Sequence, residues 1–160
     1  MIPPHTTPTA AMHHVFEVTK EAKAKGFNDV LFLDAEEHKY VEEVASCNAF
    51  IVKGHLISTS PLHGTILPGI TRKSVIELAR DLGYKVEERK FTVDELLEAD
   101  EVFCSGTAVG ISEVGSVTYK DKRAEFKSGP HSVTHELYDM ITGIQTGVVE
   151  DKNEWMVLIE

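Results

Sequence analysis

Cysteine, tryptophan and long apolar runs are scarce in this chain of 160 residues. The two cysteines, Cys47 and Cys104, lie far apart and form no Cys-x-x-Cys pattern. A disulfide framework is therefore not expected, and a reducing compartment is the default location. We expect both thiols to be small buried apolar groups. No apolar run is as long as a membrane-spanning helix, so a membrane is not expected as a partner.

Basic residues are also in deficit. The chain has 16 lysines and arginines against 26 aspartates and glutamates, which gives a formal net charge of −10. An acidic surface repels nucleic acid and anionic membranes, so neither is expected as the main partner. The charge does not exclude a local pocket for a phosphate. The hydrophobic content of 42% is typical of a globular domain.

The N-terminal segment carries no recognisable processing signal. Residues 1–15 have neither the regions of a secretory signal nor the Arg-rich pattern of a transit peptide. We expect them to form a disordered or loosely docked arm. Residues 16–160 are then long enough for one domain with a buried core.

Apolar periodicity over residues 16–160 predicts a mixed α+β domain, because helices alternate with hairpins instead of following a strict βαβ order. Residues 35–47 fit either a strand pair or a loop. Helices are expected at 16–25 before Gly26, at 72–82 before Gly83, after a Thr92/Glu95 capping box, and after Pro130. Strands are expected at 29–34, at 48–59 as a hairpin about Lys53-Gly54, at 84–91, within 101–126 and near the C-terminus.

The stretch HGTILPGITRKSVIELARDLGY, residues 63–84, joins a loop rich in glycine and threonine to one of these helices. Gly64, Pro68 and Gly69 give the loop an unusual backbone path, and Thr71 stands where a helix N-cap is expected. Free backbone N–H groups and hydroxyls at the start of a helix favour an anion such as a phosphate. The simpler interpretation is a well-capped surface helix.

A second segment of the same kind, Ser105–Ala108, places Gly106 before Thr107. If the two loops converge, their amides and hydroxyls form a cradle for a phosphate or a carboxylate. Neither loop has the spacing of a Walker loop or of a Gly-x-Gly-x-x-Gly fingerprint. Nucleotide binding by those routes is therefore not expected.

Acidic and histidine residues offer two further sites for chemistry. Glu42 or Glu43 could keep a heteroaromatic nitrogen protonated and so make the ring an electron sink, although Glu is more commonly a solvated surface acid. His131 and His135 are four residues apart on the last expected helix, which is half of a zinc-binding pattern. No third ligand is suitably spaced, so no metal site is expected. A Ser/His/Asp triad is compatible with the composition, but no Gly-x-Ser-x-Gly motif anchors one.

Five segments in order resemble one known family. They are DVLFLD (29–34), YVEEVASCNAFIVKG (40–54), GTILPGITRKSVIELARDLGYKVEER (64–89), DELLEADEVFCSGTAVGISEVGSVTY (94–119) and EDKNEW (150–155). From about Ala22 to its end, the chain is similar to the large, C-terminal domain of a plant-type branched-chain amino-acid aminotransferase. The resemblance implies a fold-type IV enzyme, in which mixed sheets form an open pseudo-barrel flanked by helices. It also implies pyridoxal 5′-phosphate (PLP) as the cofactor, and branched-chain amino acids and 2-oxo acids as substrates.

The resemblance implies a role for each residue that matches a family motif. Glu43 would pair with the pyridine nitrogen of PLP, and Leu67 would pack against the face of the ring. The turn at Gly69 would hold the phosphate, with Ile70 and Thr71 contributing backbone N–H groups and a hydroxyl.

The second loop completes the implied site. Gly106 and Thr107 would contact the phosphate as well, and the amides of Thr107 and Ala108 would face the substrate carboxylate. Both assignments agree with the anion cradle expected from the residues alone.

The resemblance fails near the N-terminus. The family's Schiff-base lysine falls on Thr7, which cannot form an imine, so no catalytic residue is expected in this chain. The family's small domain is also missing. The resemblance therefore implies a branched-chain transaminase or a truncated version of one, which transfers an amino group from leucine, isoleucine or valine to 2-oxoglutarate.

The alternative is a non-catalytic domain that binds PLP or regulates full-length homologues by associating with them. A small α+β module for phosphorylated metabolites is a third possibility. For the first two, a homodimer or an association with a full-length homologue is expected, in the cytoplasm or a plastid.

Overall fold

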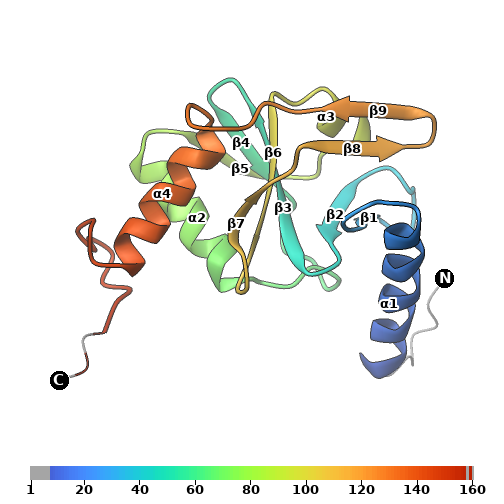
Figure 1. Ribbon diagram of the computed structural model, residues 1–160, viewed down its shortest axis with the longest axis horizontal. Coiled ribbons are helices and arrows are strands. Elements are labelled where there is room, and N and C mark those ends of the chain that lie inside the picture. Colours follow the sequence, from blue (N-terminus) through green and yellow to red (C-terminus); the bar gives the residue numbers. More distant parts are fainter. Residues whose placement is uncertain (1–7, 158, 160) are drawn as a thin grey trace.

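The computed structural model describes the backbone of residues 8–157 and 159, and the side chains of residues 16–157 and 159. A seven-stranded sheet, a separate two-stranded hairpin and four helices make up the described chain (Figure 1). In chain order the elements are α1 (Pro8–Ala24), β1 (Leu31–Leu33), β2 (Val41–Val44), β3 (Cys47–Lys53), β4 (Leu56–Thr59), α2 (Ile70–Asp81), β5 (Lys85–Glu88), α3 (Val93–Leu97), β6 (Glu101–Gly106), β7 (Gly110–Glu113), β8 (Ser116–Tyr119), β9 (Lys122–Glu125) and α4 (Val133–Gln145).

Strand β3 is the central strand of the large sheet. It pairs antiparallel with β6 from Asn48 to Val52, with β2 at its first residues and with β4 at its last. Helix α2 connects β4 to β5, and these two strands pair in parallel. The expected α+β class is confirmed, but one βαβ unit lies within it, which the hairpin-rich sequence pattern did not predict.

Both faces of β3 are buried, which explains its continuous apolar run. Phe50 and Val52 face a core formed with α2 and α4, and the ring of Phe50 stacks on that of Phe103 at 4.7 Å. Ala49 and Ile51 point to the other face, where a second core includes residues of α3 and of the β8–β9 hairpin. Side chains alternate across a strand, so one strand can supply two cores.

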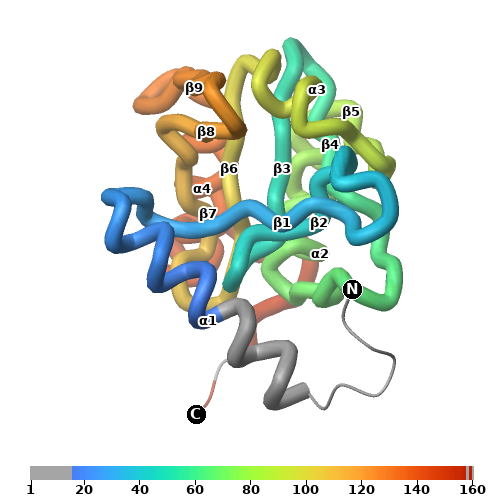
Figure 2. Tube along the Cα trace, turned by 90° about the vertical axis from the view of Figure 1, so that its right-hand side faces the viewer, coloured from blue at the N-terminus to red at the C-terminus, as the bar shows by residue number. Residues whose placement is uncertain are grey.

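Helix α1 stands on the opposite side of the molecule from α2 and α4 (Figures 1 and 2). It begins at Pro8 instead of Phe16, and it ends before Gly26, whose φ of +87° is the left-handed conformation expected at a helix end. Residues 1–7 lie outside the described part of the chain. The division into an arm of residues 1–15 and a domain of residues 16–160 stays a prediction. No helix in the described residues is long and apolar enough to cross a membrane.

Most turn predictions are confirmed. Residues 35–47 contain a turn, the single strand β2 and the first residue of β3, so each of the two alternatives describes only part of this segment. The β3–β4 hairpin forms as expected, and strands β6 to β9 lie within the predicted range 101–126. Thr92 and Glu95 make a complete capping box at the start of α3.

Two further helix starts and the C-terminal segment differ from the prediction. The N-cap of α2 is Gly69, and Thr71 lies inside the helix. Pro130 does not open α4, because Ser132 is its N-cap and accepts a hydrogen bond from the His135 amide. The described residues of the C-terminal segment, 150–157 and 159, contain no strand. A short apolar run forms a strand only when a neighbouring strand pairs with it, and among the described residues none pairs with this segment.

Candidate functional site

The loop before α2 is held against strands β2 and β3 by its own backbone. The amide N–H of Leu67 donates to Oε2 of Glu43 at 3.2 Å, and the carbonyl of Leu67 accepts from Nδ2 of Asn48 at 2.9 Å. Thr65 donates from its hydroxyl to Oε1 of Glu42 at 3.0 Å. The acidic pair and the loop, which the sequence presented as separate candidates, therefore form one site.

Glu43 is the acid that bonds the backbone of the loop. It is half-buried on β2, directly opposite Asn48 of β3. Burial raises the pKa of its carboxyl, the Leu67 amide partly offsets this, and the nearby negative charge of Glu42 raises the pKa further. A carboxylate in such a place gains from a positively charged or N–H partner, because that partner replaces lost hydration.

The start of α2 has the features of an anion-binding helix terminus. Gly69 at the N-cap has no side chain, and no side chain in the described part of the chain caps this helix. The amides of the first turn of a helix have no partners within it, and the helix dipole favours negative charge there. Ile70 and Leu67 flank this point and are 84% and 70% exposed. The helix start is therefore open to the surface.

Gly69 is required here by close packing. A Cβ added at this position would overlap Oδ1 of Asn48 and would also press on the Cβ of Arg72. Backbone and amide side chain are thus in direct contact, and no other residue type fits without displacing one of them.

The second loop packs against the same end of β3. Ser105 pairs with Asn48 across the sheet, and a Cβ at Gly106 would lie 2.9 Å from Sγ of Cys47 and 3.2 Å from the carbonyl oxygen of Ser46. Thr107 and Ala108 follow in the exposed turn between β6 and β7. Both expected loops therefore contact the first residues of β3, as a shared cradle requires.

A buried hydroxyl lies beside this junction. Ser105 is 1% exposed, and its Oγ has no hydrogen-bond partner among the described residues. A buried hydroxyl without a partner is costly, so a polar group from a ligand would be favoured near it. The sequence did not identify Asn48, and it identified Ser105 only as the first residue of the second segment, not as a buried hydroxyl. The sequence does contain a signal for Asn48, because it is a polar residue that precedes the apolar run Ala49–Val52 of β3.

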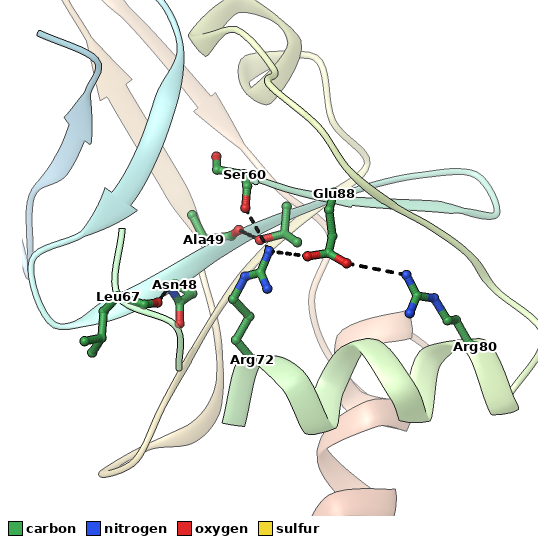
Figure 3. A network of polar contacts seen from close by, with 8 residues as sticks. Asn48, Ala49, Ser60, Leu67, Arg72, Arg80 and Glu88 are labelled. Atoms are coloured by element: carbon green, nitrogen blue, oxygen red, sulfur yellow. Dashed lines mark hydrogen bonds and ion pairs between the residues drawn. The ribbon is translucent and has the colours of Figure 1, made fainter. Parts of the chain in front are cut away.

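The sequence also did not predict the buried hydrogen bonds that attach α2 to the sheet. The guanidinium of Arg72 is buried and donates from Nη2 to the carbonyl of Ser60 at 2.8 Å and to Oε2 of Glu88 at 3.0 Å. Arg80 reaches the other oxygen of Glu88 at 3.6 Å (Figure 3). These contacts fix the first and last turns of α2 to β5, and so fix where the helix begins.

A cavity of about 780 Å³ lies on the other face of β3, between α1 and strands β6–β9, and reaches the second loop at Val109. Its described lining includes Cys47 and Cys104 but no residue of the Leu67–Thr71 turn. The cradle is therefore an open surface that is separate from this cavity.

The two cysteines differ in how deeply they are buried. Cys104 is buried, as expected, and burial raises the pKa of its thiol to about 12. Cys47 is only half-buried.

His131 precedes the N-cap of α4, so the expected pair of histidines on one helix face does not exist. His135 instead lies 3.4 Å from Asp139. The described residues contain no group of three His, Cys, Asp or Glu side chains that could hold a metal.

Comparison with known proteins decides the family. Residues 2–117 match the family described as Amino-transferase class IV, which is more than half of the chain. This chain belongs to the class IV aminotransferases. The resemblance to an aminotransferase family seen in the sequence is therefore confirmed.

Curated relatives of this class IV aminotransferase chain include plant enzymes. It is 63% identical over 139 residues to branched-chain amino acid aminotransferase 1, mitochondrial, of Humulus lupulus, a match that covers 87% of this chain and 35% of the relative. It is 57% identical over 140 residues to branched-chain-amino-acid aminotransferase 6 of Arabidopsis thaliana, covering 88% and 39%. The chain thus spans less than half of the length of these relatives.

Solved structures agree on the fold. The branched-chain amino acid aminotransferase of Escherichia coli matches with a TM-score of 0.81 at 37% identity, covering 95% of this chain and 52% of that one. The branched-chain amino acid aminotransferase of Thermobaculum terrenum, solved in its PLP-form, matches with a TM-score of 0.78 at 31% identity, covering 92% and 47%. The architecture is that of the C-terminal domain of fold-type IV aminotransferases.

The position expected for the family's lysine, Thr7, lies outside the described residues. The roles of the other expected site residues stay predictions. These residues are Glu43, Leu67, Gly69, Ile70, Thr71, Gly106, Thr107 and Ala108.

Proposed function

We propose that this chain carries the PLP-binding part of a branched-chain amino-acid aminotransferase. The observation that carries the proposal is the contact between Glu43 and the Leu67 amide, which puts a half-buried carboxylate beside an open helix start. The carboxylate suits a protonated pyridine nitrogen, and the open helix start suits a phosphate. The relatives described above support this assignment, and the whole reaction is proposed for the full length of such an enzyme.

The residues present fit the cofactor. The first-turn amides of α2 and the Thr71 hydroxyl would hold the phosphate, together with Thr107 from the second loop. Gly69 leaves the backbone open to the ligand, and the exposed Leu67 side chain would cover one face of the ring. The Glu43 carboxylate would keep a proton on the pyridine nitrogen, which would in turn offset the loss of hydration at Glu43. PLP itself supplies the electron sink for amino-group transfer.

The substrate class follows from the relatives and from the second loop. The plant relatives are named branched-chain aminotransferases, and one Arabidopsis thaliana relative at 49% identity is named a methionine aminotransferase. All these substrates have unbranched or branched apolar side chains and a carboxylate. The amides of Thr107 and Ala108 in the exposed turn would bind that carboxylate.

Binding of PLP to the purified chain tests the proposal. The absorbance of PLP should change on binding, and Glu43→Gln should weaken binding about tenfold or more, because a hydrogen bond between charged groups is lost. Glu42→Gln is the matched control, since Glu42 contacts Thr65 and not the Leu67 amide. Equal effects of the two substitutions, or no binding by the wild-type chain, would contradict the proposal.

A second measurement addresses the missing nucleophile. After PLP is added, borohydride reduction and peptide mass spectrometry reveal whether any lysine is attached to the cofactor. We expect none, because the lysine position falls on Thr7. A trapped lysine would show that this chain supplies its own nucleophile.

We keep a non-catalytic partner role as the second candidate, because apolar side chains surround the cradle. Ile70, Leu67 and Leu62 are all exposed on this loop. A full-length homologue would cover such a surface in a mixed dimer. Co-purification with a tagged full-length homologue should then occur, and a strictly non-associating chain would rule the role out.

A further inference from the structure

Asn48 is the residue at which the three parts of the site meet. Across the sheet it faces Glu43 on one side and Ser105 on the other. Its side chain reaches a third segment, because Nδ2 donates to the carbonyl of Leu67 at 2.9 Å and Oδ1 lies where a Cβ at position 69 would be. The residue is 5% exposed, so its amide is held inside this junction.

The chemistry of an amide suits these contacts. Nδ2 donates to the loop backbone, whereas Oδ1 occupies the space that a side chain at Gly69 would need. Figure 3 shows Asn48 and Leu67 side by side, next to the first turn of α2, from which Arg72 reaches Ser60 and Glu88. Arg72 fixes the helix to β5, but Asn48 is the side chain that ties the turn to the strand opposite Glu43.

We propose that Asn48 is a positioning residue that sets the distance between the pyridine-nitrogen subsite at Glu43 and the phosphate subsite at Gly69–Thr71. It touches neither end of the ligand itself. Asn48 donates a hydrogen bond to the carbonyl of Leu67, and Glu43 accepts one from the amide of the same residue. Both backbone polar groups of Leu67 are therefore bonded to the sheet. This role rests on the function proposed above.

The substitution that tests it is Asn48→Asp. Its shape is nearly unchanged, but the donor to Leu67 is lost and an oxygen faces a carbonyl oxygen, so the turn should move away from β3. Asn48→Ser removes the same donor without adding charge, and it serves if the aspartate variant does not fold. Asn28→Asp adds the same charge at an exposed position and is the control.

Two measurements separate this inference from the proposed function. In the ligand-free chain, amide hydrogen exchange in residues 62–72 should rise about tenfold or more in either Asn48 variant and stay unchanged in the control. In the presence of ligand, the affinity for PLP should fall about tenfold, while the affinity for pyridoxal, which lacks the phosphate, should change by less than about twofold. A merely destabilised domain would lose affinity for both compounds.

Each result has one meaning. Faster exchange together with selective loss of PLP binding supports the positioning role. If the wild-type chain binds no PLP but exchange still rises in the variants, the proposed function fails and Asn48 remains the residue that holds the turn. Unchanged exchange, or equal losses for PLP and pyridoxal in a folded variant, overturns the inference.

Discussion

Single residues at the junction of β2, β3 and the loop decide what this surface can bind. Glu42 and Glu43 are adjacent in the sequence and look alike there. In the structure, Glu43 accepts from the Leu67 amide in a half-buried place, whereas Glu42 accepts from a threonine hydroxyl. The difference arises from strand alternation, since neighbouring residues point to opposite faces.

Glu43 should lower the stability of the ligand-free chain at neutral pH. Its pKa is raised above the ordinary value of 4.5, so the folded chain holds this proton more tightly than the unfolded chain. The contribution of protonated Glu43 to the free energy of unfolding is therefore complete below about pH 4.5, and it is lost as the pH rises through the pKa of the folded chain. We expect Glu43→Gln to raise Tm at pH 7 and to have no such effect at pH 4, as measured by thermal melts. A lower Tm at pH 7 would contradict this prediction.

Gly69→Ala should be destabilising because the new methyl group overlaps the Asn48 amide. We expect a loss of about 1–3 kcal/mol in the free energy of unfolding, measured with urea. Gly64→Ala is the matched control on the same loop, since a Cβ there meets nothing within 4 Å. Its effect should lie within about 0.5 kcal/mol of zero, and equal losses would show that the contact with Asn48 is unimportant.

At the scale of elements, α2 is placed by its contacts more than by its own sequence. The apolar pattern of residues 72–82 predicts the helix and Gly83 predicts its end, and both are confirmed. The same pattern misplaces the N-cap, because the threonine at position 71 looks like a better cap than glycine. Gly69 takes that place instead, since the loop must pass close to Asn48.

Arg72 should contribute more to stability than any exposed arginine of α2. Its side chain is only 4% exposed and bonds Ser60 and Glu88, whereas that of Arg80 is 52% exposed. We expect Arg72→Gln to lower the free energy of unfolding by about 2 kcal/mol, because a buried carbonyl and a carboxylate lose their donor. Arg80→Gln, the control, should cost less than about 1 kcal/mol in the same urea titration. A cost of Arg72→Gln no greater than that of the control would refute the anchoring role.

At the scale of the whole molecule, the two cores lie on opposite faces of β3, and the cradle lies at one end of that strand. Chain segments far apart in the sequence, 42–48, 65–71 and 105–108, are brought to this end by the order of strands β2, β3 and β6. The exposed side chains around it form an apolar surface in the described chain. Such surfaces favour association.

The purified chain should therefore self-associate in a concentration-dependent manner. Light scattering should show a mass that rises with concentration, and Ile70→Asp should reduce the rise, since Ile70 is the most exposed of the large apolar side chains near the start of α2, at 84%. Val148→Asp changes an equally exposed residue, at 83%, that follows α4 and is not part of the loop, and should leave association unchanged. A monomer at all concentrations would contradict the prediction.

Local sequence patterns are sufficient to predict the class of fold and most helices and hairpins, and they indicate residue types suited to a phosphate and a pyridine nitrogen. These follow from local periodicity, turn residues and the chemistry of single side chains, all of which act over a few positions. Contacts between distant segments settle the rest: Glu43 bonds the backbone of the loop whereas Glu42 bonds a side chain of it, Gly69 is the N-cap of α2, and Asn48 lies between Glu43 and Ser105 in the sheet. Those outcomes depend on strand register and on contacts between distant segments, which no local pattern encodes.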